Sequence, residues 1–142
     1  ALILGGYFLL RNVIDFSGIA GSLSANAGVN KNNFLFISLY ISFINSLLEE
    51  FFFRGFLFSN LKQSATRGFA YCFSSLMFAL YHVAMMIGWF HPAILLLLIA
   101  GLMAGGIIFN LLNEKQENIC ISWLVHMFAN FAINTVGFIL MA

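Results

Sequence analysis

Residues 34–61 read FLFISLYISFINSLLEEFFFRGFLFSNL, an almost unbroken apolar stretch. A helix needs about 20 apolar residues to cross the roughly 30 Å hydrocarbon layer of a bilayer, so this stretch is long enough to span one. Its middle nevertheless carries three charged side chains, Glu49, Glu50 and Arg54. A charge at the centre of a membrane helix costs at least about 2.5 kcal/mol, so we interpret these residues as functional.

The composition of the whole chain agrees with a membrane protein. Of 142 residues, 62% are hydrophobic and 8% are charged, whereas soluble domains carry about 25% charged residues. This excludes a soluble globular fold and makes membrane lipids the expected surroundings. The six Lys and Arg are scattered and the net charge is +1, so no basic stripe indicates a nucleic-acid partner. Cys72 and Cys120 are far apart, and we expect both to be small buried side chains.

Further apolar runs predict an all-α, polytopic transmembrane helix bundle. Four full spans are expected, over residues 34–61, 68–90, 93–112 and 119–141. In the third span, small residues form a face on which a neighbouring helix can approach closely: Gly101, Ala104, Gly105 and Gly106. Loops rich in Lys and Arg favour the cytoplasmic side, which weakly places residues 61–68 and 113–118 there.

The N-terminal part is read separately from the core. Residues 1–33 are expected to hold a partial transmembrane segment, ending near Leu10, and a loop rich in Gly, Ser, Ala and Asn over residues 17–33. Because the apolar run is already under way at Ala1, we expect the sequence to begin inside a segment of a longer protein. Residues 34–142 form the predicted core.

Helix geometry predicts that the ionisable groups of three spans meet. At 1.5 Å per residue, Glu49 lies about 17 Å from the Leu61 end of its span. On the next spans His82 lies about 20 Å from Gly68, and His126 about 10 Å from Ile119. Adjacent spans alternate in direction, so all three depths are measured from the same face. We expect these groups to meet in the middle of the bilayer.

Helical spacing then separates these groups by role. Glu50 and Arg54 are four residues apart, with the acid first, which favours an ion pair. Glu49 points about 100° away from Glu50 and has no cation on its own face. On the last span one polar face is expected to point into the bundle: Ser122, His126, Asn130 and Asn134.

These residue types indicate hydrolysis of a peptide bond. A buried carboxylate beside an imidazole is suited to act as a general base, so Glu49 and His82 are expected to activate a water molecule. The attacked carbonyl then develops an oxyanion. His126 and Asn130, one turn apart, are expected to supply two N–H donors to that oxyanion. Neither a metal nor another cofactor is part of this prediction.

At these residues the sequence resembles the CPBP (Abi) intramembrane proteases, which include type II CAAX prenyl endopeptidases and bacteriocin self-immunity proteins. Three motifs carry the resemblance, in order and on separate spans. They are Glu-Glu-x-x-x-Arg at residues 49–54, Phe-x-x-x-His at residues 78–82 and His-x-x-x-Asn at residues 126–130. The resemblance covers residues 37–141 and implies that the chain is the catalytic core of a larger helical bundle.

The resemblance also implies roles for the motif residues. Glu49 and His82 activate water, and His126 with Asn130 forms the oxyanion hole. Glu50 and Arg54 support the site, and Phe78 shapes it. The family implies a glutamic endopeptidase that works without metal. Its substrate is a peptide or protein, either prenylated or a peptide precursor, and its place is a bacterial plasma membrane.

Two other functions compete with this interpretation. A non-catalytic immunity or scaffold protein of the same fold would keep the motifs without cleaving a substrate. A membrane cytochrome would use His82 and His126 as axial ligands of a haem, although this leaves Glu49 unexplained. A zinc protease is disfavoured because the chain has no His-Glu-x-x-His sequence. The sequence does not indicate an oligomeric state or a particular substrate.

Overall fold

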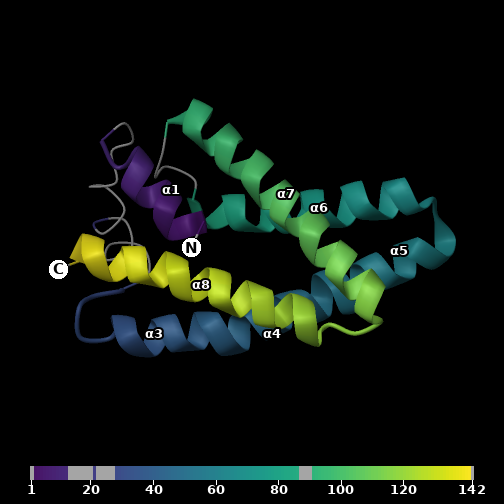
Figure 1. Ribbon diagram of the computed structural model, residues 1–142, viewed down its shortest axis with the longest axis horizontal. Helices are drawn as coiled ribbons and strands as arrows, with labels where there is room; N and C mark the ends of the chain where they lie inside the picture. Colours follow the sequence, from purple (N-terminus) through teal and green to yellow (C-terminus); the bar gives the residue numbers. More distant parts are fainter. Residues whose placement is uncertain (1, 13–20, 22–27, 87–90, 142) are drawn as a thin grey trace. The chain divides into compact units, whose positions relative to one another are not determined.

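The computed structural model describes residues 2–12, 21, 28–86 and 91–141, and every regular element within these residues is a helix (Figure 1). The prediction of an all-α fold is confirmed. In chain order the elements are α1 (Leu2–Leu10), α3 (Phe34–Tyr40), η1 (Ile41–Asn45), α4 (Ser46–Glu50), η2 (Phe51–Phe58), α5 (Ser59–Ser64), α6 (Arg67–Met86), α7 (Pro92–Gln116) and α8 (Cys120–Met141). The labels η1 and η2 denote π-helical segments.

Three helices in the described part of the chain are long and apolar enough to cross a membrane. They are Phe34–Ser64, which joins α3 to α5, and the helices Pro92–Gln116 and Cys120–Met141. The protein is therefore an integral membrane protein. Helix α6, which lies in the second predicted span, has 20 residues but is not among these three. The end of that span at residues 87–90, and most of the predicted loop over residues 17–33, lie outside the described residues.

The described chain divides into two compact units. Unit 1 combines Ala1–Ser46 with His126–Ala142, and unit 2 is Leu47–Val125. The first and third motifs therefore do not fall in the same unit. Glu49, Arg54 and His82 belong to unit 2, whereas His126 and Asn130 belong to unit 1.

A four-residue repeat explains why the helix Phe34–Ser64 contains π-helical turns. Every fourth residue from Phe34 is buried: Phe34, Ser38, Ser42 and Ser46 in unit 1, and Glu50, Arg54 and Phe58 in unit 2. Glu49 and Phe53, each next to one of these positions, are buried as well. A regular α-helix has 3.6 residues per turn, so a repeat of four would drift around its surface. The i→i+5 bonding of η1 and η2 places more residues in each turn and offsets this drift. The stripe thereby stays on the buried side.

Unit 1 is held by contacts of α3 and η1 with the second half of α8. The side-chain amide of Asn134 donates to Ser38 O at 3.2 Å and to Ser42 Oγ at 3.1 Å. The rings of Phe34 and Phe138 meet edge to face at 4.5 Å. Small serines on one helix and an asparagine on the other let polar groups bond across the interface, a common way of joining membrane helices.

In unit 2, helices α6 and α7 approach closely at one glycine. A Cβ atom on Gly106 would lie 3.0 Å from both Cα and Cβ of Ser75. The predicted small-residue face is thus confirmed at Gly106. It is not confirmed at Gly101 and Gly105, where a Cβ atom would meet nothing within 4 Å. Gly105 differs from Gly106 because consecutive residues of a helix point about 100° apart around its axis.

A carboxylate ties the ends of α5, α6 and α7 together. Glu114 on α7 pairs with Lys62 at 3.3 Å and with Arg67 at 2.7 Å. It also accepts a hydrogen bond from the Tyr71 hydroxyl at 2.6 Å. Lys62 and Arg67, predicted to share one side of the membrane, are therefore at the same end of unit 2.

The prediction that both cysteines are buried is wrong. Cys72 and Cys120 are exposed on the described chain. In a membrane protein, positions facing acyl chains and positions facing the core are both apolar, so a small apolar-like residue fits either one. Sequence hydropathy does not separate the two surroundings.

Candidate active site

The first motif lies where α4 passes into η2, and its charged groups are buried. Glu49 is 5% exposed, and Glu50 and Arg54 are 0% exposed. Glu50 Oε1 lies 3.2 Å from Arg54 Nη1, which confirms the ion pair predicted from their spacing. Because the two charges lie together in a low-dielectric interior, each offsets the cost of burying the other.

Aromatic rings complete the surroundings of the Arg54 guanidinium. Its central carbon lies 4.2 Å from the centre of the Phe78 ring, 4.9 Å from that of Phe109 and 5.9 Å from that of Phe53. A cation over ring faces is stabilised by the ring quadrupoles, and more strongly where water is excluded. Arg54 is thus a structural anchor of unit 2.

Phe78 connects this anchor to the second motif. It is 2% exposed, and its ring centre lies 4.5 Å from that of the His82 imidazole. Its carbonyl oxygen also lies 2.8 Å from His82 Nδ1. A carbonyl only accepts hydrogen bonds, so Nδ1 carries a hydrogen, and in neutral His82 the lone pair is on Nε2. The residue four before the histidine therefore fixes both the tautomer and the ring plane.

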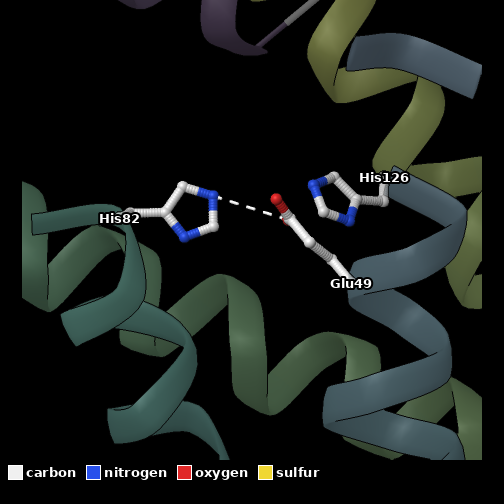
Figure 2. A group of neighbouring side chains, drawn as sticks. All are labelled: Glu49, His82 and His126. Atoms are coloured by element: carbon white, nitrogen blue, oxygen red, sulfur yellow. Dashed lines mark ion pairs between the residues drawn. The ribbon is translucent and has the colours of Figure 1, made fainter. Parts of the chain in front are cut away.

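Glu49 and His82 face each other across α4 and α6, as predicted from their depths. His82 Nε2 lies 3.6 Å from Glu49 Oε2, the pair joined by the dashed line in Figure 2. The side chain of Glu49 is 6% exposed and that of His82 is 20% exposed. The gap exceeds a direct hydrogen bond, but catalytic contacts are often this long before substrate binds. A buried carboxylate facing an imidazole nitrogen is an arrangement suited to acid–base chemistry.

The third motif lies on α8. His126, also drawn in Figure 2, is 4% exposed and follows Val125, the last residue of unit 2, along the same helix. Within unit 1, the side-chain amide of Asn130 donates to Ile41 O at 3.3 Å. Ser122 and Asn134 are buried as well, so three members of the predicted inward face are buried and Asn130 is half-buried.

The residue types also include possible metal ligands. Glu49, His82 and His126 each offer one ligand atom of a kind that binds metal ions. One carboxylate with two imidazoles is the protein ligand set of some catalytic zinc sites.

Helix α7 contributes residues to this site that the sequence analysis missed. Phe109 is one wall of the Arg54 cage, and Asn110 is a fully buried polar residue beside it. Asn110 could have been identified from the sequence as a polar residue within an otherwise apolar span, because polar groups are seldom buried in a membrane protein without a function.

A membrane protein made of helices, with a buried carboxylate opposite an imidazole, has groups suited to acid–base chemistry within the membrane. Residues 31–132 match the model of a protein family described as type II CAAX prenyl endopeptidase Rce1-like. The chain therefore belongs to this Rce1-like family of CAAX-type intramembrane proteases. Comparisons with curated proteins and with solved structures gave no match.

Proposed function

We propose that this protein is an endopeptidase that cleaves peptide bonds within the membrane with a water molecule activated by Glu49 and His82. The observation that carries the proposal is the pairing of a buried carboxylate with His82 Nε2 at 3.6 Å. The bond between His82 Nδ1 and Phe78 O supports it, since it leaves Nε2 as the nitrogen available for proton transfer.

The proposed step is the addition of water to an amide carbonyl. The water oxygen bonds to the carbonyl carbon while one of its protons passes to the Glu49–His82 pair. The carbonyl oxygen becomes an oxyanion. When the tetrahedral intermediate collapses, the C–N bond breaks, and the proton held by the pair goes to the leaving nitrogen. The products are a carboxylic acid and an amine, with one water consumed.

In this proposal the oxyanion is stabilised by His126 and Asn130. They are one turn apart on α8, and His126 is buried, where a hydrogen bond to a developing charge is stronger than in water. A primary amide has two N–H donors. One of those on Asn130 bonds to Ile41 O, and the other is the donor assigned to the oxyanion.

The expected substrate is a peptide or protein held at the membrane, either prenylated near its C-terminus or a peptide precursor. Family membership supports this substrate class. The support given by Glu50 and Arg54 belongs to the same proposal: their buried ion pair holds the turn that carries Glu49. A bacterial plasma membrane is the proposed location.

The Glu49→Gln variant tests the proposal. It keeps the shape of the side chain and removes the base, so cleavage should fall at least about 100-fold. Mass spectrometry of membrane peptides, from cells carrying each variant, identifies both the cut peptide and the cut bond. Glu117→Gln is the matched control, because Glu117 is exposed at the end of α7 and its loss should leave cleavage unchanged.

Equal peptide profiles for wild type and Glu49→Gln would contradict the catalytic proposal. If the biological output also survived the substitution, the protein would be a non-catalytic immunity or scaffold protein of the same fold. The two results are separate measurements, so each interpretation has its own test.

A further inference from the structure

Asn110 is the polar residue buried deepest in the apolar helix α7. It is 0% exposed, and its side-chain amide donates to Ser75 Oγ at 3.2 Å and to Tyr71 O at 3.4 Å. Both partners are on α6. The amide therefore bonds to the backbone and to a side chain of one stretch of α6, just where Gly106 lets the two helices approach.

This stretch of α6 reaches the first motif through one hydroxyl group. Ser74, which is 1% exposed, lies between two acceptors: Phe53 O at 2.9 Å and Asn110 Oδ1 at 3.5 Å. A hydroxyl has one hydrogen, so the shorter contact takes it. Ser74 thus donates to the Phe53 carbonyl inside the π-helical segment η2 and not to Asn110 Oδ1. Asn110 instead holds the stretch of α6 around Ser74, through its bonds to Tyr71 O and Ser75 Oγ.

Phe109 makes a second contact between α7 and the same turn. Its ring centre lies 4.9 Å from the central carbon of Arg54. Two consecutive residues of α7 therefore act on η2. Phe109 contacts the Arg54 side chain directly, and Asn110 holds the stretch of α6 whose Ser74 hydroxyl donates to the Phe53 carbonyl.

The held turn lies four residues after Glu49. π-Helical turns are rare and depend on their surroundings, so contacts from outside determine where such a segment settles. A shift of about 1 Å in a reacting group can lower a rate about 100-fold. Contacts that fix residues 53 and 54 therefore also fix the carboxylate one turn earlier relative to His82.

We infer that Asn110 is a positioning residue for the Glu49–His82 pair. Its bonds to Tyr71 O and Ser75 Oγ hold the stretch of α6 from which Ser74 donates to the Phe53 carbonyl, and Phe109 contacts Arg54 beside it. The catalytic consequence rests on the proposed function. The geometric consequence does not, because the pair exists without substrate.

Nitrogen-15 NMR of the His82 imidazole in the full chain, held in nanodiscs, tests the geometry without substrate. Its shifts report the tautomer and whether Nε2 has a partner. Glu49→Gln gives the reference spectrum of a disrupted pair. The Asn110→Leu spectrum should move from the wild-type position toward that reference, and the smaller change Ser74→Ala should do the same. Asn113→Leu is the control, since Asn113 is also buried on α7, one turn further on.

Activity gives a second readout. Asn110→Leu and Ser74→Ala should lower kcat about tenfold or more while KM changes less than about twofold, whereas Asn113→Leu should leave both near wild type. Wild-type His82 signals in both Asn110→Leu and Ser74→Ala, with changed signals in Glu49→Gln, would overturn the inference. So would a Glu49→Gln spectrum identical to wild type. Failure of the proposed function would appear separately, as unchanged cleavage in Glu49→Gln.

Discussion

The guanidinium carbon of Arg54 lies 4.2 Å above the centre of the Phe78 ring, so the two motifs are stacked on one another inside the protein. Phe78 also contacts the His82 imidazole, with ring centres 4.5 Å apart. One ring therefore transmits the position of a buried cation to the histidine that faces Glu49. This stacking gives a physical reason for an aromatic residue four positions before the histidine.

Replacing Phe78 by Leu should lower both the stability of the protein and its rate of cleavage, and the two effects can be measured separately. The substitution keeps an apolar side chain but removes both ring contacts, and the lost cation–π interaction is worth about 2 kcal/mol where water is excluded. Cleavage should fall about tenfold or more, because His82 loses the surface against which it is oriented. Thermal unfolding and kcat measure the two effects. Phe69→Leu, at a half-exposed position of α6, should change neither by as much.

The Glu50–Arg54 pair should behave as a unit in a double-mutant cycle. Glu50→Gln or Arg54→Met alone leaves a buried charge without its counter-ion, which costs about 3–5 kcal/mol of unfolding free energy. The double variant should lose clearly less than the sum of the single losses. Reversible unfolding in mixed micelles gives these values. Additive losses would show that the ion pair is not coupled, despite the 3.2 Å separation.

Two adjacent glycines of α7 should respond in opposite ways to alanine. At Gly106 the added Cβ would lie 3.0 Å from the Ser75 backbone, so Gly106→Ala should destabilise the protein by about 1–3 kcal/mol. At Gly105 nothing lies within 4 Å, so Gly105→Ala should be neutral or stabilise the helix by up to about 1 kcal/mol. The midpoint of thermal unfolding distinguishes them, and equal shifts would contradict the close approach of α6 and α7.

Chelation of metal ions tests how the water is activated. The glutamate–imidazole scheme needs no metal, so EDTA should leave the cleavage rate within about twofold of its starting value. Glu49, His82 and His126 are nevertheless all of metal-binding type. Loss of activity in EDTA with recovery on adding zinc would replace proton transfer by a metal-bound hydroxide, whose pKa is about 7 in zinc enzymes.

The pairing of Glu50 with Arg54 and the meeting of Glu49 with His82 could both be predicted from the sequence. These two contacts follow from the number of residues per helical turn and from the rise per residue, which are nearly constant in α-helices. The placement of His126 and Asn130 against the pair stays a prediction.

The π-helical turns and the role of α7 could not be predicted in this way. The residues buried at every fourth position from 34 to 58 can be seen in the sequence. A search with the α-helical period of 3.6 residues does not distinguish these positions from the positions next to them. The sequence shows Asn110 as a polar residue in an apolar span, but not its partners, because the geometry that gives it partners exists only once α6 and α7 have packed. The prediction that both cysteines are buried failed because positions facing lipid and positions in the protein core favour similar residues.

The winding of η2 also restricts how this segment can vary in length. Each residue of an α-helix accounts for about 100° of rotation, and the extra residues in η2 are accommodated by its wider turns. A single deletion among residues 51–58 would rotate everything beyond it by about a quarter turn relative to Glu49 if the remaining residues kept their winding. Rewinding them as ordinary α-helix would offset this rotation but would remove the wide turns. We therefore expect related chains to carry other apolar residues in place of the exposed Phe51, Phe52 and Phe56. Selection should remove insertions and deletions between Glu50 and Phe58.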